Sequence, residues 1–285
     1  MSRAETTLRT PSPLWSFGLL RSELGTVFRR WRTLALLGVL AAVPVLVGIA
    51  VKLQTHGDHG GGGPAFIAEV TNNGLFLVFT ALAVTLPFFL PMAIGVIAGD
   101  AIAGEASAGT LRYLLVAPAG RTRLLLVKYA SVMVFCLVAT LVVAASALLV
   151  GAVLFPLGDV TLISGITVPF TDGLLRAVAI AGVVAVSLIG IAALGLFIST
   201  LTDSGIAAMA TTVGVLITVQ IMDTIPQLHT IQPYLFPHYW LSFADLLRSP
   251  VVFDGLAKNL EVQALYAAVF GSAAWARFTT RDITA

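Results

Sequence analysis

The sequence predicts an all-α protein that crosses a membrane six times. Of its 285 residues, 58% are hydrophobic and only 11% are charged, whereas about a quarter of the residues of an average soluble domain are charged. Six apolar runs reach about 20 residues, the length that a helix needs to cross the hydrocarbon core of a bilayer. The runs are continuously apolar and lack the alternation of barrel strands, so we expect helices.

The six expected spans follow one another along the chain. They cover residues 33–53, 74–98, 124–155, 173–201, 205–225 and 256–278. The third run is too long for one upright span and is expected to tilt or to begin outside the membrane. Pro87 and Pro91 are expected to bend the second span, either to line a transport path or as a structural bend. The sixth run is the least hydrophobic and carries Lys258 and Glu261 near its start.

Basic residues predict which side of the membrane each connector faces. Six arginines precede the first span, and three arginines and Lys128 follow the second span, whereas connectors 54–72 and 156–172 contain no lysine or arginine. Positively charged connectors stay in the cytoplasm, so both chain ends are expected there, with a bacterial inner membrane as the location. The resulting divisions are a cytoplasmic lead (1–32), a transmembrane domain (33–278) and a cytoplasmic tail (279–285).

Residues 12–32, SPLWSFGLLRSELGTVFRRWR, predict an amphipathic helix ahead of the first span. Apolar side chains recur at spacings of three and four, the period of a helix face, while Glu23 and the arginines lie elsewhere on the helical wheel. Such a helix suits an anionic membrane surface; packing on another protein is the alternative. The residues expected at the lipid interface are Arg21, Arg29, Arg30 and Trp31.

Two of the three connectors expected outside the cytoplasm have a distinctive composition. In residues 56–64, HGDHGGGGP, the histidines and the aspartate suggest metal ligands, but a run of four glycines does not hold ligands rigidly, so we expect a solvated loop and no metal site. Residues 226–255 are rich in aromatic side chains. Their stretch HYWLSFADLLR predicts a short extracellular helix at the interface, or a re-entrant segment shielded by the protein.

Catalytic and nucleotide-binding motifs are missing from the sequence. None of the three lysines follows a glycine, so there is no phosphate-binding P-loop, and there is no HExxH zinc motif. The chain is therefore expected to be no enzyme and to bind no cofactor. Charges deep in a span often mark an ion or proton path. Those of this chain fall near the expected span ends, which disfavours an ion-coupled transporter.

Residues 99–123, GDAIAGEASAGTLRYLLVAPAGRTR, concentrate two acids and three arginines between two apolar runs. Asp100 and Glu105 are expected to continue the helix of the second span beyond the membrane. Gly109 is expected to break it, and Thr110 to cap a short helix of sequence TLRYLLVA that ends at the turn APAG. A short helix with an apolar face and no local core needs a partner surface.

This connector resembles the membrane permeases of the ABC-2 (type V exporter-like) family of ABC transporters. The resemblance rests on GDAIAGEASAGTLRYLLVAPAGRTRLLLVK, supported by the amphipathic helix before the first span, PHYWLSFADLL before the sixth and ARFTTRDI near the end. It implies that the short helix is a coupling helix docked on a separate ATP-binding subunit. Its contact residues would be Glu105, Gly109, Thr110, Leu111, Arg112, Leu114, Leu115 and Pro118.

The resemblance also implies partners. Two permeases, a second copy or a homologous chain, would pair, and ATP and Mg²⁺ would bind to the partner subunits. The complex would be an exporter, and because few polar residues face the spans, we expect a hydrophobic or amphiphilic cargo, such as a drug or a lipid. Glu105 is expected to orient the connector, while Arg112, Arg121 and Arg123 either share that role or bind anionic lipid headgroups. The alternatives are a secondary transporter or channel, and a membrane scaffold or integral-membrane enzyme.

Overall fold

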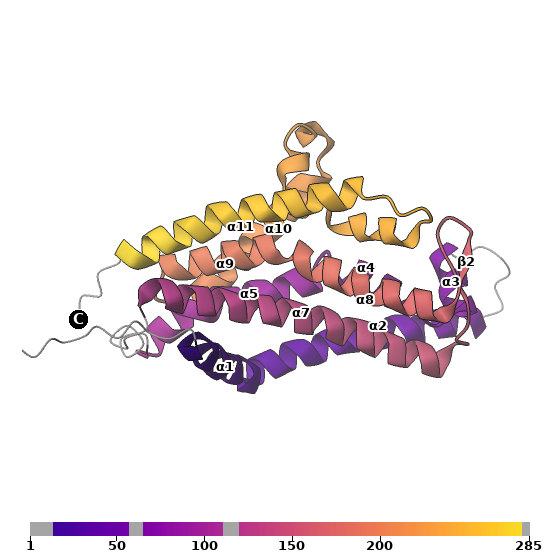
Figure 1. The fold of residues 1–285 in the computed structure, drawn as a ribbon, viewed down its shortest axis with the longest axis horizontal. Helices are drawn as coiled ribbons and strands as arrows, with labels where there is room; N and C mark the ends of the chain where they lie inside the picture. Colours follow the sequence, from indigo (N-terminus) through magenta and orange to yellow (C-terminus); the bar gives the residue numbers. More distant parts are fainter. Residues whose placement is uncertain (1–13, 57–64, 111–119, 281–285) are drawn as a thin grey trace, which may run out of the picture.

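The computed structural model describes residues 14–56, 65–110 and 120–280, which form an elongated helical bundle (Figure 1). The helices are α1 (Leu14–Arg29), α2 (Trp31–His56), α3 (Ala65–Asn72), α4 (Phe76–Thr85), α5 (Phe89–Ser107), α7 (Arg121–Leu154), α8 (Phe170–Ser187), α9 (Ile189–Leu201), α10 (Gly205–Thr224) and α11 (Asp254–Thr280). Three short 3₁₀ helices join α10 to α11, namely η1 (Pro226–Leu228), η2 (Gln232–Tyr234) and η3 (Trp240–Leu247). One antiparallel hairpin pairs β1 (Val160–Thr161) with β2 (Thr167–Val168).

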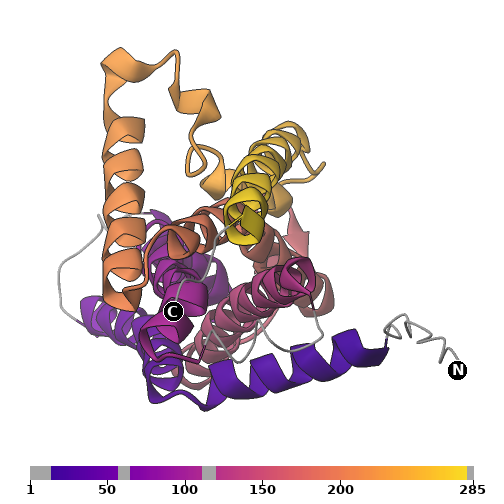
Figure 2. The same cartoon turned by 90° about the vertical axis from the view of Figure 1, so that its left-hand side faces the viewer.

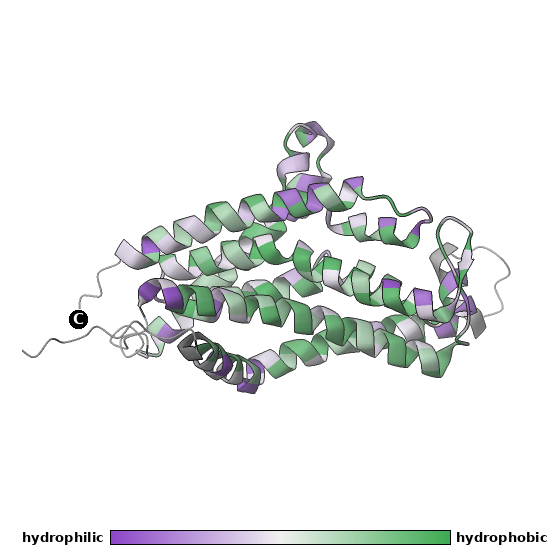
Figure 3. Ribbon diagram, viewed as in Figure 1, coloured by the Kyte–Doolittle hydropathy of each residue, from purple (hydrophilic) through white to green (hydrophobic). Residues whose placement is uncertain are grey.

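Five segments of the described chain are long and apolar enough to cross a membrane. They are Trp31–Gln54, Phe89–Ser107, Arg121–Leu154, Phe170–Leu201 and Gly205–Thr224. Hydrophobic residues dominate the middle of the bundle, and hydrophilic residues gather mainly toward its ends and around η1 and η2 (Figure 3). The chain is therefore mostly helical, and the length and hydropathy of these segments suit a membrane protein. The sixth expected span is the helix α11, which packs along α9 but is not apolar enough to count among these five.

The second expected span is divided into two helices. α4 ends at Thr85 and α5 begins at Phe89, with a turn at Leu86–Phe88 that contains Pro87. Proline lacks an amide hydrogen and disfavours helical geometry in the residue before it, so the expected bend at Pro87 is confirmed. Pro91 lies in the first turn of α5, where a proline is tolerated. Beyond this break, α5 continues to Ser107 and includes both acids, as expected.

The fourth expected span is also interrupted, at Leu188 between α8 and α9. A polar network compensates for the break. The amide of Gly190 donates to Oε1 of Gln263 at 3.0 Å, and Nδ2 of Asn259 donates to the hydroxyl of Ser187 at 2.7 Å. Both α11 side chains are at most 2% exposed. Buried backbone groups need such partners because no water reaches them in a membrane.

Glycines bring α5, α9 and α10 into close contact. A Cβ atom on Gly99 would lie 3.0 Å from the backbone of Met209 on α10, and one on Gly95 would lie 3.2 Å from Cγ2 of Thr212. A Cβ atom on Gly195 of α9 would lie 2.8 Å from the side chain of Ala98. Small residues one turn apart allow membrane helices to pack closely by van der Waals contact. The backbone of α5 therefore lies in close contact with both α9 and α10.

The two ends of the bundle differ. At one end, here called the α1 end, α5 and α11 finish, α7 begins, and α1 lies across the bundle (Figures 1 and 2). The opposite end carries α3 and the hairpin, which the sequence did not predict. The expected short helix of HYWLSFADLLR is the 3₁₀ helix η3, with Trp240, Phe243 and Leu247 buried. α10 packs along α5, from Gly205 beside Gly104 to the hydrogen bond that Gln220 donates to the carbonyl of Pro87, and the chain that follows α10 projects from the bundle (Figure 2).

We predict that Gly99→Ala lowers the free energy of unfolding by about 1–3 kcal/mol, because the added methyl group meets the backbone of α10. Thermal unfolding of the purified protein in detergent measures this. The matched control is Gly214→Ala on α10, where nothing lies within 4 Å of the added atom, so its stability should stay at or slightly above the wild-type level. Equal effects of both changes would contradict the packing described here.

Candidate functional site

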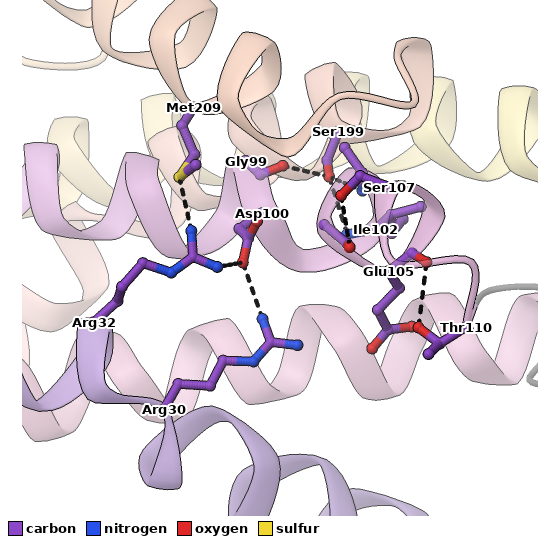
Figure 4. Close-up of polar contacts among 12 residues, drawn as sticks. Arg30, Arg32, Gly99, Asp100, Ile102, Glu105, Ser107, Thr110, Ser199 and Met209 are labelled. Atoms are coloured by element: carbon purple, nitrogen blue, oxygen red, sulfur yellow. Dashed lines mark hydrogen bonds and ion pairs between the residues drawn. The ribbon is translucent and has the colours of Figure 1, made fainter.

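The C-terminus of α5 is closed by a glycine turn. Gly109 has a φ of +70°, a left-handed geometry that glycine adopts without a steric penalty. Its amide donates to the carbonyl of Ala106, and the amide and hydroxyl of Thr110 both donate to the carbonyl of Glu105 (Figure 4). This pair of backbone bonds is a Schellman motif. The expected break at Gly109 is confirmed, and Gly120, with a φ of +71°, directly precedes α7.

Asp100 is the centre of a first ion cluster at the α1 end. Its Oδ2 atom accepts from Nη1 of Arg30 at 2.9 Å and from Nη2 of Arg32 at 3.0 Å (Figure 4). Arg30 lies at the bend between α1 and α2, and Arg32 lies in the first turn of α2. The other carboxylate oxygen lies beside Gly205, the first residue of α10, where the helix dipole favours a negative charge. Asp100 thus connects α5 to the α1–α2 junction and to α10.

Lys128 is the centre of a second ion cluster. It lies in the second turn of α7 and is only 2% exposed. Its ammonium group donates to Oε1 of Glu105 on α5 and, at 2.7 Å, to Oε1 of Glu23 on α1. A buried charge is tolerated only when it is paired and hydrogen-bonded. One cation therefore holds together the end of α5, the start of α7 and the middle of α1.

Ser199 of α9 forms hydrogen bonds with the backbone of α5. Its hydroxyl donates to the carbonyl of Gly99 at 2.6 Å and accepts from the amide of Ala103 at 2.9 Å (Figure 4). In a regular α-helix the amide of residue i+4 bonds the carbonyl of residue i directly. Ser199 bonds both of these groups, so α9 holds the turn of α5 that contains Asp100 and precedes Glu105.

A small cavity of about 20 Å³ lies between the two ion clusters. Its polar lining comes from Glu23, Arg30, Arg32, Thr33, Asp100, Lys128 and Ser131. This volume is enough for about one water molecule with several polar partners. The two clusters therefore bring three acids and three bases together at the α1 end, namely Glu23, Asp100, Glu105, Arg30, Arg32 and Lys128. Within the described part of the chain, no three histidine, cysteine, aspartate or glutamate residues are placed to hold a metal ion.

Only part of the expected coupling segment falls in the described structure. Glu105, Gly109 and Thr110 lie together at the end of α5. The Oε2 atom of Glu105 is buried and has no hydrogen-bond partner within the described ranges. The other expected contact residues lie outside the described residues. They are Leu111, Arg112, Leu114, Leu115 and Pro118.

The expected lipid-interface residues divide into two groups. Arg21, Arg29 and Trp31 are exposed, whereas Arg30 points to Asp100. Arg121, in the first turn of α7, donates to the carbonyl of Thr279 near the end of α11 at 2.8 Å. Arg123, also near the start of α7, is half-buried. Arg30 and Arg121 therefore connect elements of this chain, whatever contacts they also make with lipid.

The sequence interpretation of α1 needs one correction. Glu23 was expected away from the apolar face, but it points inward to Lys128, because it lies on the same helical face as Leu20 and Val27. When an acid lies three or four residues from apolar side chains on the same helix face, that position indicates a buried cation as its partner. The contributions of Arg32, Lys128 and Ser199 were missed, because their partners lie between 23 and 105 residues away along the chain.

The sequence matches the family described as "Protein of unknown function (DUF2705)" over residues 47–284. The match covers most of the chain, which therefore belongs to this family. It includes α5, the connector and α7, whereas α1 with Glu23, and Arg30 and Arg32 around the start of α2, precede the matched residues. Comparison with curated proteins gives no match.

We predict that Lys128→Met lowers the free energy of unfolding by about 3–5 kcal/mol, because it leaves two acids near each other without their cation. Adding Glu105→Gln should restore part of this loss, because the second change removes one of the unpaired charges. Thermal unfolding in detergent measures both variants. Lys258→Met is the matched control, since Lys258 is exposed on α11; equal losses for the two single variants would refute the role of Lys128.

Proposed function

We propose that this protein is the membrane-spanning permease subunit of an ABC-2-type ATP-binding cassette transporter, an exporter of a hydrophobic or amphiphilic compound. The α1 end would face the bacterial cytoplasm. The sequence motif that begins at Glu105 supports this proposal, and so does its setting. Gly109 and Gly120, both with a positive φ, lie at the described ends of the connector, and the bonded pair of Glu105 and Lys128 flanks them in sequence.

That ion pair is the observation on which the proposal depends most. A connector that passes force from a partner to the membrane needs rigid attachment at both of its ends. Glu105 lies four residues before Gly109, and Lys128 lies eight residues after Gly120, and the two side chains are buried against each other. A push on the connector would therefore move α5 and α7 as one unit.

Movement would then pass through the close contacts of α5. The Gly95 and Gly99 contacts join it to α10, and the Ser199 bridge joins it to α9. Rigid helices that shift together can change access to a path between two permease halves. The second half would be another copy of this chain or a homologous permease. ATP and Mg²⁺ would bind on the partner ATPase subunits, in keeping with the missing P-loop in this sequence.

A secondary transporter is the second candidate function, and one observation favours it. Asp100, Glu105 and Lys128 are buried within helices long enough to cross a membrane, and such groups can carry protons. Transport by reconstituted vesicles under an imposed proton gradient, without ATP or a second protein, would support this candidate. Loss of transport on omission of ATP or of the ATPase subunit would support the ABC-2 proposal.

We predict that the ATP-binding subunit co-purifies with the wild-type chain and hydrolyses ATP faster when the chain is present. Leu114→Asp should abolish this stimulation, because a carboxylate replaces an apolar side chain of the expected coupling helix. Glu105→Ala should reduce it by about tenfold, a loss that corresponds to ~1.4 kcal/mol of coupling.

ATPase activity of the co-reconstituted complex measures both effects. Leu157→Asp is the control. Leu157 is exposed in the connector before the hairpin, at the opposite end of the bundle. Normal stimulation by membrane-inserted Leu114→Asp and Glu105→Ala proteins would overturn the coupling assignment.

A further inference from the structure

The face of α1 that packs on the bundle is already occupied. Val27 is 8% exposed, the ring of Phe28 lies 6.2 Å from that of Phe135 on α7, and Glu23 bonds Lys128. The apolar face that the sequence assigned to the membrane surface is thus largely used within the protein. The opposite face of α1 is exposed among the described residues.

This opposite face contains a shallow groove of about 380 Å³. It is lined by Ser22, Gly25, Thr26, Arg29 and Arg30. The first four are exposed and recur at spacings of three and four along α1, so the small side chains form its floor and the arginines its end. No atom lies within 4 Å of a Cβ atom built on Gly25, which leaves the floor open.

The charge of this face is positive. Arg21 and Arg29 are exposed, and neither forms an ion pair with a described residue. Arg30 uses Nη1 for Asp100, and a guanidinium group carries five N–H donors, so others remain for the groove. Glu23, the acid of α1, is turned toward Lys128. Of the two arginines that line the groove, Arg30 shares its charge with Asp100, whereas Arg29 has no carboxylate partner among the described residues.

Two large aromatic side chains are exposed near the ends of this helix. Phe17 is 71% exposed and Trp31 is 80% exposed. Aromatic side chains of this kind are typical of the membrane–water interface. α1 is followed after one residue by α2, whose hydropathy suits a membrane span, so we expect α1 at the depth at which phospholipid headgroups are found.

We propose that this groove binds the phosphate of an anionic phospholipid. The guanidinium groups of Arg29 and Arg30 donate to the phosphate oxygens, as arginine forks do, and the hydroxyl of Ser22 lies at the same surface. Arg30 also holds Asp100, so a bound headgroup contacts the ion cluster that fixes α1 to α5. The site requires a membrane location and is independent of the proposed coupling to an ATPase.

The test is a titration of the purified full-length protein in neutral detergent with phosphatidylglycerol, with bound lipid counted by native mass spectrometry. Arg29→Ala should weaken binding about fivefold, since one basic residue near a membrane surface contributes about 1 kcal/mol. Gly25→Leu should weaken binding at least as much by filling the groove. Without lipid, its thermal stability should stay at or slightly above the wild-type level, because no described atom lies within 4 Å of the added Cβ atom and leucine favours a helix more than glycine does.

The controls separate a specific site from a general effect of charge. Arg277→Ala removes the same exposed charge from α11 at the same end of the molecule, and should change binding less than twofold. Phosphatidylcholine should bind more weakly than phosphatidylglycerol. Equal weakening by Arg277→Ala, unchanged binding by Gly25→Leu, or displacement of the lipid by excess inorganic phosphate would overturn the proposal. Normal ATPase stimulation by these variants would leave the permease proposal intact.

Discussion

The buried ammonium group of Lys128 is the interaction on which the α1 end of this protein depends. A lysine that is 2% exposed is rare unless it is paired, and here two carboxylates from different helices share it. Without that cation, Glu23 and Glu105 would face each other in a poorly solvated space, where like charges repel strongly. The arrangement of α1, α5 and α7 therefore follows from a single electrostatic requirement.

The Asp100 cluster extends this arrangement to α2 and α10. Two arginines and the N-terminus of α10 surround one carboxylate, while Ser199 holds the intervening stretch of α5 to α9. The glycine contacts of α5 then continue the attachment toward the middle of the bundle. A protein that passes a mechanical signal from one end needs such a continuous set of short-range contacts, because flexible contacts would absorb the motion. This is the physical link between the fold and the proposed function.

Much of the architecture could be predicted from hydropathy and from helix-breaking residues. The long apolar runs predicted the long apolar helices, Pro87 predicted the break between α4 and α5, and Gly109 predicted the end of α5. Hydropathy alone describes the sixth span less well, because Lys258, Glu261 and the amides of Asn259 and Gln263 make α11 less hydrophobic. Tertiary hydrogen bonds satisfy both of these buried amides.

The ion clusters could not be predicted, because they join residues far apart in the sequence. Lys128 is followed and preceded by apolar residues and resembles an ordinary positive flank of a span, and no local pattern relates it to a glutamate 105 residues earlier. Asp100 and Arg30 are separated by 70 residues. The 3₁₀ geometry of η3 also depends on tertiary packing, since its sequence has the periodicity of an ordinary amphipathic helix.

The central claim is that Lys128 fastens α1 to the bundle through Glu23 and fastens α5 to α7 through Glu105. Hydrogen–deuterium exchange of the wild type, Glu23→Gln and Lys128→Met tests it most directly. We expect faster exchange in α1 alone for Glu23→Gln, and in both α1 and the last turn of α5 for Lys128→Met, with α8 and α9 unchanged in both. Wild-type exchange rates in α1 for both variants would contradict the account.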